Sequence, residues 1–306
     1  MAPSAISMST PSSPAADLEA ISDAVDEVNV LKNQTMTAYD TTSAFDSTKD
    51  KTQFRQYTTA TARVQDFYYE QHAKQTVAYN LAARVRFNSD SRIRKELSVW
   101  EALERLNALT DPSDPDTSLS QIQHALQTAE AIRRDGKPRW MQAAGLIHDL
   151  GKLMLEFGLA EGQWDVVGDS FPVGCPFDDS VIFHEAFALN PDDKNPVYSS
   201  GSGIYESGCG IENLLMSWGH DEFLYLIVKD QSTLPPEALA MIRYHSFYAW
   251  HREGAYRHFM AEKDCATLNA VQAFSPYDLY SKSDEPPEVE ELKVGLDSLY
   301  RIVYDC

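Results

Sequence analysis

Long apolar runs are missing from this sequence of 306 residues, because charged and polar residues interrupt every stretch before it reaches the length of a membrane span. A helix that crosses a bilayer needs about 18 or more consecutive apolar residues. The sequence therefore argues against a membrane protein. Internal repeats are missing and period-two alternation is almost absent, whereas apolar residues recur at three- and four-residue steps. This pattern predicts an all-α fold.

Basic residues are scarce, since 26 Lys and Arg stand against 46 Asp and Glu and give a formal net charge of −20. Such a surface repels nucleic acid and anionic lipid, and the sequence holds no local basic patch. We therefore expect neither a nucleic-acid partner nor a membrane partner. A neutral substrate suits this charge better, and bound metal ions would offset part of the acidic excess.

Cysteine pairs of the CxxC type are missing as well. The four cysteines, Cys175, Cys209, Cys265 and Cys306, lie far apart, unlike those of a zinc ribbon or a dense disulfide framework. Residues 1–17 contain neither an apolar core nor a Lys or Arg, so they resemble neither a secretory signal nor an Arg-rich presequence. We expect a reduced, cytoplasmic protein.

The helical pattern begins near residue 49. Residues 1–48 are largely composed of Ser, Pro, Ala, Thr and Asp, so we expect a disordered or loosely ordered extension, followed by a single helical domain over 49–306. Residues 158–208 are rich in Gly, Pro, Asn and Asp and predict a long functional loop system. The ranges expected to be helical are 61–86, 92–109, 121–134, 138–157, 212–229, 234–251 and 287–304.

Four histidines fall within these predicted helices beside apolar or small residues: His124, His148, His220 and His245. One such histidine alone is more often a hydrogen-bonded core residue. The set, together with Asp149 directly after His148, weakens that interpretation, because buried polar groups on separate helices need a shared partner. A metal centre provides one.

The chemistry of these side chains limits which metal they could bind. Imidazole nitrogens with carboxylate oxygens and no thiolate suit iron, manganese or zinc. One carboxylate can also bridge two cations about 3.5–4 Å apart. Asp221 follows His220, but an aspartate two residues after Gly219 can simply face solvent.

Several blocks of the sequence resemble the signature blocks of the myo-inositol oxygenase family, in the same order and with similar spacing. They are FRQY (54–57), HALQTAE (124–130), LIHDLGK (146–152), QWDVVGDSFPVGC (163–175), LLMSWGHDEF (214–223), MIRYHSFYAWH (241–251) and YDLYSK (277–282). The resemblance covers residues 48–306. It implies an HD-domain-like helical bundle with a mixed-valent non-haem diiron centre and no organic cofactor.

The resemblance also implies which residues bind the two irons. The first iron would be bound by His124, His148, Asp149 and Asp278. Asp149 would bridge to the second iron, which His220 and His245 complete. Asp278, in SPYDLYSK, would by itself be taken for a turn or cap residue, so its assignment depends wholly on the resemblance.

Lys152 lies one helical turn after His148 and projects from a similar face. A salt bridge to Asp149 is the simplest interpretation. The resemblance implies that Lys152 and Asp149 are catalytic, and that the lysine contacts inositol hydroxyls, where a fixed ammonium favours an alkoxide. Further substrate contacts implied by the resemblance are Arg55, Asp111, Ser113, Gly168, Asp169, His245 and Ser246. Pro112 departs from the family, which commonly has an acidic residue there, and proline removes a backbone N–H that could bind substrate.

The implied reaction is the four-electron ring cleavage of myo-inositol by dioxygen to D-glucuronate and water, the first step of inositol catabolism. Myo-inositol and dioxygen are then the partners of a monomeric enzyme. An HD-type phosphohydrolase is the main alternative, because that superfamily uses the same ligand pattern for hydrolysis. Phosphate sites usually add Arg or Lys clamps, and besides Lys152 only Arg243 is a candidate here. A non-catalytic interaction protein that keeps the fold is the second alternative.

Overall fold

The structure, a computed structural model, describes residues 44–47, 49, 55, 57, 60–88, 94–109, 111–113, 120–283, 289 and 301–305. These residues all fall within one compact unit, Thr41–Cys306. The expected N-terminal extension, residues 1–48, lies outside the described residues except for Ala44–Ser47, which forms a short helix. The domain boundary near residue 49 therefore stays a prediction.

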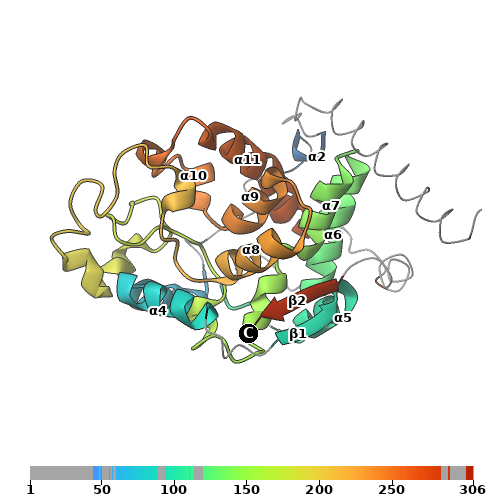
Figure 1. The fold of residues 1–306 in the computed structure, drawn as a ribbon, viewed down its shortest axis with the longest axis horizontal. Helices are drawn as coiled ribbons and strands as arrows, with labels where there is room; N and C mark the ends of the chain where they lie inside the picture. Colours follow the sequence, from blue (N-terminus) through green and yellow to red (C-terminus); the bar gives the residue numbers. More distant parts are fainter. Residues whose placement is uncertain are drawn as a thin grey trace, which may run out of the picture. The chain divides into compact units, whose positions relative to one another are not determined.

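Helices dominate the described part of the chain, which confirms the all-α prediction (Figure 1). They are α2 (Ala44–Ser47), α3 (Ala62–Lys74), α4 (Val77–Phe87), α5 (Val99–Leu106), α6 (Gln121–Arg134), α7 (Arg139–Ile147), α8 (His220–Gln231), α9 (Pro236–Tyr244), α10 (Tyr248–His251) and α11 (Asp264–Tyr280). Short 3-10 helices connect several of them. Within the described residues no helix is both long enough and apolar enough to span a bilayer.

One two-stranded sheet corrects the expected helix over 92–109. Strand β1 (Arg94–Ser98) pairs antiparallel with β2 (Arg301–Asp305), with Arg94 opposite Asp305. Helix α5 begins only after Ser98, whose hydroxyl accepts a hydrogen bond from the Glu101 N–H at 3.1 Å while the Glu101 carboxylate accepts one from the Ser98 N–H at 2.7 Å. This capping box fixes a helix start and excludes helix upstream of it. Strand β2 also replaces the end of the helix expected over 287–304.

Other expected helices are shorter than the periodicity suggested. The helix expected over 138–157 breaks after Ile147 and resumes as a 3-10 helix, Leu150–Met154. The helix expected over 212–229 begins at His220, and the one over 234–251 splits into α9 and α10. These interruptions fall at the histidines of the sequence motifs.

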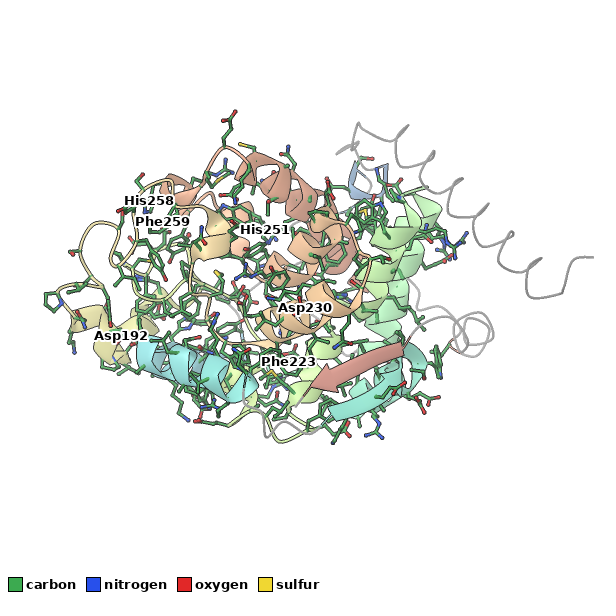
Figure 2. The ribbon with its side chains drawn as sticks, viewed as in Figure 1. Asp192, Phe223, Asp230, His251, His258 and Phe259 are labelled. Atoms are coloured by element: carbon green, nitrogen blue, oxygen red, sulfur yellow. The ribbon has the colours of Figure 1, made fainter. Side chains whose placement is uncertain are left out.

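Two apolar clusters hold the helices together. The first includes Leu103, Leu150 and Phe223 and packs helices α3, α5, α6 and α8 around the Leu150–Met154 turn. The second includes Trp250 and Phe259 and packs the loop system against α9, α10 and α11. Figure 2 labels Phe223 and Phe259, one from each cluster. In Figure 1, α6 lies beside α7, and α8 beside α9, in agreement with their residue contacts.

The predicted loop system over 158–208 contains short 3-10 helices and turns but no α-helix. Buried side-chain amides in α3 and at its C-cap fix the backbone of this loop system. Gln71 donates to the Val167 carbonyl at 2.9 Å, and Gln75 donates to the Trp164 carbonyl at 3.4 Å. A buried backbone carbonyl needs such a partner. Residues 166–170 are thereby anchored although they belong to no regular element.

Candidate functional site: a buried cluster of histidines and aspartates

The predicted metal ligands come from helix ends that converge. His124 lies in the first turn of α6, His148 and His245 are the C-cap residues of α7 and α9, and His220 begins α8. Asp149 directly follows His148, and Asp278 lies in the last turn of α11. We call these six residues the metal floor: His124, His148, Asp149, His220, His245 and Asp278. All are at most 6% exposed.

A glycine lets two of these helix ends meet. A Cβ atom on Gly151 would lie 2.1 Å from the carbonyl oxygen of His220, far inside van der Waals contact. Only glycine therefore permits the turn after Asp149 to approach the start of α8 this closely. The close approach places the Asp149 carboxylate beside the imidazole of His220.

The first half of the metal floor surrounds Asp278. The Nε2 atom of His124 lies 3.0 Å from Asp278 Oδ1, and Nε2 of His148 lies 3.3 Å from the same oxygen. The ligand atoms of these three residues all lie within 4.8 Å of one another, a spacing that could hold a metal ion. Asp149 Oδ2 lies 3.6 Å from His148 Nε2 and 3.9 Å from His124 Nε2, so it faces the same group.

The second half surrounds the other oxygen of Asp149. Nε2 of His220 lies 3.3 Å from Asp149 Oδ1, and Nε2 of His245 lies 3.8 Å from it. The two Nε2 atoms are 3.1 Å apart. One carboxylate thus presents a different oxygen to each pair of histidines, which is the arrangement of a carboxylate shared by two cations.

Three imidazoles are oriented by backbone carbonyls. Nδ1 of His148 donates to Gly145 at 2.8 Å, Nδ1 of His220 to Val166 at 2.7 Å and Nδ1 of His245 to Ile242 at 2.9 Å. A proton held on Nδ1 leaves Nε2 as the ligand atom, and such outer hydrogen bonds typically fix metal-binding histidines. His251 (labelled in Figure 2) adds support, because its Nε2 donates to the His245 carbonyl at 2.9 Å.

A nitrogen atom of the metal floor makes no hydrogen bond of good geometry within the described residues. Nε2 of His148 is buried and has no hydrogen-bond partner of good geometry among the described residues. A buried polar atom without a partner costs free energy unless something else contacts it. Its position beside Asp149 and Asp278 makes a cation the fitting partner, so the side chains present fit a metal centre.

The carboxylates of the metal floor are ionised. Burial alone would raise the pKa of Asp149, but Lys152 and His148 hold it well below its usual range. Burial would also raise the pKa of Asp278, which His124 and His148 hold well below its usual range. Both carboxylates are thus stabilised as anions by neighbouring hydrogen-bond donors and charges although they are buried.

The pKa values of three imidazoles of the metal floor are shifted in two opposite directions. Burial lowers the pKa of His124 and of His245, so these two are neutral and can donate lone pairs. Burial would lower the pKa of His220 too, but Asp221 and Asp149 raise it to about 10. Metal binding requires neutral imidazole, so a cation would displace the proton that the carboxylates stabilise there.

A pocket lies beside the metal floor. The residues that line it are mostly polar and include all seven remaining predicted site residues. We call these the polar wall: Arg55, Asp111, Ser113, Lys152, Gly168, Asp169 and Ser246.

Lys152 connects the wall to the floor. Its ammonium donates to Asp149 Oδ2 at 2.9 Å, to Asp111 Oδ2 at 3.0 Å and to Gln121 Oε1 at 3.0 Å. The salt bridge to Asp149 expected from spacing is therefore present, within a larger network. Burial would lower the pKa of Lys152, but Asp149 and Asp111 raise it, so the lysine is charged.

Two further pairs of wall residues contact each other, one pair through an ion pair and the other through a hydrogen bond. Arg55 donates to Asp169 Oδ2 at 2.7 Å, and its guanidinium lies 3.6 Å from the centroid of the Tyr248 ring. Across the pocket, the backbone N–H of Ser113 donates to Asp111 Oδ1 at 2.9 Å. Pro112 spans this turn without an N–H of its own, so the polar contacts there come from the residues on either side of it.

Comparison with known proteins assigns the chain to a family. The family model described as myo-inositol oxygenase matches residues 61–301. An inositol oxygenase of Dictyostelium discoideum is 46% identical over 263 residues, which is 84% of this chain and 89% of that protein. Inositol oxygenase 1 of Arabidopsis thaliana is 48% identical over 78% of each chain, and the inositol oxygenase of Danio rerio 44% identical over 82% of this chain and 91% of its own.

The chain belongs to the myo-inositol oxygenase family. Since 241 residues from 61 to 301 match, membership covers both the metal floor and nearly all of the polar wall. Only Arg55 lies upstream of the matched range. The family resemblance of the sequence blocks is thereby confirmed. The individual roles of the floor and wall residues stay predictions.

Several pocket residues of this family member escaped the motif analysis. Gln121, Tyr248 and Lys282 line the pocket together with Tyr57 and Tyr68. Gln121 could have been noticed, because it lies one turn before His124 on the same helix. Tyr248 and Lys282 stand within motif blocks already quoted, but nothing in their spacing marks them as pocket residues.

Two expectations from the sequence were wrong. Asp221 is buried, with 4% exposure, and its Oδ1 lies 2.9 Å from Nε2 of His220 rather than in solvent. Arg243, the candidate phosphate clamp, instead makes a buried ion pair with Glu222, at 2.7 Å from Nε to Oε2. Of the two basic residues that the phosphohydrolase alternative could use, Lys152 and Arg243, the structure thus engages the weaker candidate, Arg243, elsewhere.

Proposed function

We propose that this chain is an inositol oxygenase that cleaves the ring of myo-inositol with dioxygen to give D-glucuronate and water. The observation that carries the proposal is the metal floor, in which one buried carboxylate faces two pairs of histidines at the base of a polar pocket. Family membership supports the same activity, and the printed names of the relatives are those of inositol oxygenases.

Two iron ions would bind in the metal floor. His124, His148, Asp149 and Asp278 would hold the first, and Asp149, His220 and His245 the second. Nitrogen and carboxylate ligands without thiolate suit iron. A mixed-valent pair of irons supplies the redox chemistry that lets dioxygen accept four electrons, with no organic cofactor needed.

The polar wall binds and orients the substrate. Myo-inositol carries a hydroxyl on every ring carbon, and a polyol of this kind needs donors and acceptors on several sides. Arg55 and Asp169 form an ion pair at the pocket, Asp111 and Ser113 form a hydrogen-bonded pair there, and Gly168 and Ser246 line the same pocket. His245 contributes from the floor itself.

Lys152 controls the charge on the reacting hydroxyl. All three of its ammonium hydrogens are engaged, so it can donate to a substrate oxygen only by releasing one partner. Asp111, at 12% side-chain exposure, is the more exposed of its two carboxylate partners and can turn to a substrate hydroxyl instead. The ammonium then stabilises the substrate oxygen as it loses its proton.

The enzyme acts as a cytoplasmic monomer, with a catalytic HD-domain-like bundle that spans residues 49–306. The cysteines Cys175, Cys209 and Cys265 are free thiols, which supports a reducing compartment.

Oxygen uptake tests the proposal. Protein loaded anaerobically with Fe²⁺ and mildly reduced should consume one dioxygen per myo-inositol cleaved and release an equal amount of glucuronate. A sugar phosphate offered to the same protein should yield no phosphate. Absence of uptake by protein that holds two irons, together with phosphate release, would overturn the proposal in favour of hydrolysis.

A further inference from the structure

Gln121 is a buried amide at the pocket to which neither the sequence motifs nor the family resemblance gave a role. It is the first residue of α6, and it lines the pocket although it is only 9% exposed. A capping box fixes this end of the helix: the Ser120 hydroxyl accepts the Gln123 N–H at 3.4 Å, and the Gln123 side chain accepts the Ser120 N–H at 3.2 Å. The backbone that carries Gln121 is therefore held independently of the Gln121 side chain.

The Gln121 side chain contacts Lys152. Its Oε1 atom accepts a hydrogen bond from the Lys152 ammonium at 3.0 Å, and within the described residues this is the one hydrogen bond of the Gln121 side chain. Lys152 is 7% exposed, so both partners are buried. A hydrogen bond to a charged group is strong, and it is strengthened further where water is excluded.

The three acceptors of the ammonium are not equivalent. Asp149 Oδ2, at 2.9 Å, also faces Nε2 of His148 at 3.6 Å, so a cation bound in the metal floor would compete for this oxygen. Asp111 Oδ2, at 3.0 Å, is the partner that turns to a substrate hydroxyl. The amide oxygen of Gln121 is neutral and belongs to none of the proposed metal ligands, so it stays with Lys152 when metal and substrate bind.

Two fixed acceptors determine where the third ammonium hydrogen points. The three hydrogens lie in tetrahedral directions about one nitrogen, which rotates at the end of a flexible four-carbon stem. With Asp149 and Gln121 engaged, the remaining hydrogen faces the position that Asp111 leaves. Without Gln121 the ammonium can rotate away from that position. A misplacement of about 1 Å can cost on the order of a hundredfold in rate.

We propose that Gln121 is a positioning residue for Lys152, which it holds so that the ammonium faces the substrate hydroxyl that reacts. This inference rests on the proposed function and extends it to a residue outside the predicted site. Gln121 acts through Lys152 rather than by its own contact with substrate. Because the ammonium stabilises charge that develops as the hydroxyl loses its proton, the effect of Gln121 falls on kcat rather than on KM.

Two other roles for Gln121 would have different kinetic consequences. If Gln121 only stabilises α6, its loss lowers the stability of the fold and leaves kcat per folded, iron-loaded chain unchanged. If its amide N–H group binds substrate directly, its loss raises KM, and glutamate, which lacks that donor, cannot replace it. A positioning role needs only an acceptor oxygen at this place, which glutamate supplies.

The test compares Gln121→Met with Gln121→Glu in the iron-loaded full chain, with iron per chain, kcat and KM for myo-inositol measured on each preparation. Methionine keeps the length of the side chain but offers only a weak acceptor. Gln121→Met should hold two irons, with kcat lowered about tenfold to a hundredfold and KM within about twofold of the wild-type value. Gln121→Glu should recover most of the lost kcat.

Gln123→Met is the matched control. It removes an amide from the same helical turn, together with the contact to the Ser120 N–H, but keeps the contact between Gln121 and Lys152. Its kcat and KM should equal those of the wild type. A double-mutant cycle completes the test: in the Lys152→Ala background, Gln121→Met should cause no further loss of kcat, because the group that it positions is gone.

A wild-type kcat in Gln121→Met, or an equal loss of kcat with and without Lys152, would overturn the inference while the proposed function stands. A Gln121→Glu variant as impaired as Gln121→Met would do the same, because the acceptor oxygen would then not be what matters. A wild-type chain that holds two irons and consumes no oxygen with myo-inositol would overturn the proposed function and this inference with it. An unchanged circular dichroism spectrum shows that each variant is folded. If Gln121→Met does not fold, Gln121→Ala replaces it, since alanine is favourable in a helix, and the same outcomes apply.

Discussion

The polar wall and, apart from His148, the metal floor line the same pocket but are held in different ways. Floor residues stand at the ends of α-helices, and backbone carbonyls fix three of the imidazoles. Wall residues stand mostly in turns and loops and are held by other side chains, as Arg55 is by Asp169 and Lys152 by Asp111. Backbone anchors keep the floor in one geometry, whereas side-chain partners can be exchanged for the hydroxyls of a substrate.

This difference predicts two classes of variant. A change in the floor should remove metal, and activity with it. A change in the wall should leave the metal in place and alter turnover or substrate affinity. A floor variant that keeps its metal, or a wall variant that loses metal, would show that the two regions do not act separately.

The largest effect is expected from Asp149→Ala. It removes the one carboxylate that faces both pairs of histidines and leaves the Lys152 ammonium with fewer acceptors. We expect loss of both irons and a fall in turnover of about a thousandfold or more, equivalent to about 4 kcal/mol or more. Elemental analysis and oxygen uptake measure the two quantities. A variant that keeps two irons would contradict the bridging role.

Lys152→Ala should lower turnover by about a hundredfold to a thousandfold, the scale of losing one charged donor at a reacting oxygen. It should still bind two irons, because the lysine donates to Asp149 but is not itself a ligand. Stopped-flow and iron analysis on the same preparation separate the effects. Unchanged kinetics would end the assignment of Lys152 as catalytic.

Arg55→Ala should raise KM for myo-inositol about tenfold, or about 1.4 kcal/mol, with little change in kcat. The side chain loses its ion pair with Asp169 and its contact with the Tyr248 ring. In a double-mutant cycle with Asp169→Asn the two changes should be non-additive, because the residues form one pair. Strict additivity of the two KM effects would show that each contacts substrate independently.

The smallest effect on iron content and activity is expected outside both regions, at His72. This fully buried histidine bonds to the Ile182 carbonyl at 2.7 Å and stacks on Phe187, and burial lowers its pKa to about 4. An unfolded chain takes up this proton near pH 6.5, so the group destabilises the fold as pH falls from about 6.5 towards about 4. Above that window it has no such effect.

His72→Gln should therefore flatten the pH dependence of stability without altering iron content or KM. Between about pH 6.5 and pH 5 the wild type should lose about 2 kcal/mol more than the variant, since one proton contributes at most about 1.4 kcal/mol per pH unit. Urea unfolding at the two pH values measures this difference. Parallel pH profiles of the two proteins would show that His72 is not the titrating group.

Local sequence predicted the helices better than their ends. The apolar spacing in residues 138–157 is the same on both sides of His148, so it could not show that the helix stops there. The break is imposed by the start of α8, which approaches Gly151 too closely for any other residue. Ser98 and Glu101, by contrast, carry a local capping signal that could have placed the start of α5 correctly.

The candidate site was predicted unevenly for the same reason. The histidines and Asp149 stand out because ionisable groups among apolar residues are costly without a partner. Asp278 and the wall residues had no such signal and were found through the resemblance alone. Asp221 was misjudged, because a position two residues after a glycine does not reveal what another helix will cover.

The sequence by itself determined the helical class, the net charge of −20 and the types of side chain available to a metal. Those properties depend on composition and on spacing within one helix. The tertiary structure decided which oxygen of Asp149 faces which histidine pair, how Lys152 is partnered and that Asp221 is buried beside His220. These depend on contacts between segments far apart in the chain, such as His124 and Asp278, which are 154 residues apart. No local pattern encodes such distances, because they arise only when the helix ends close on one another.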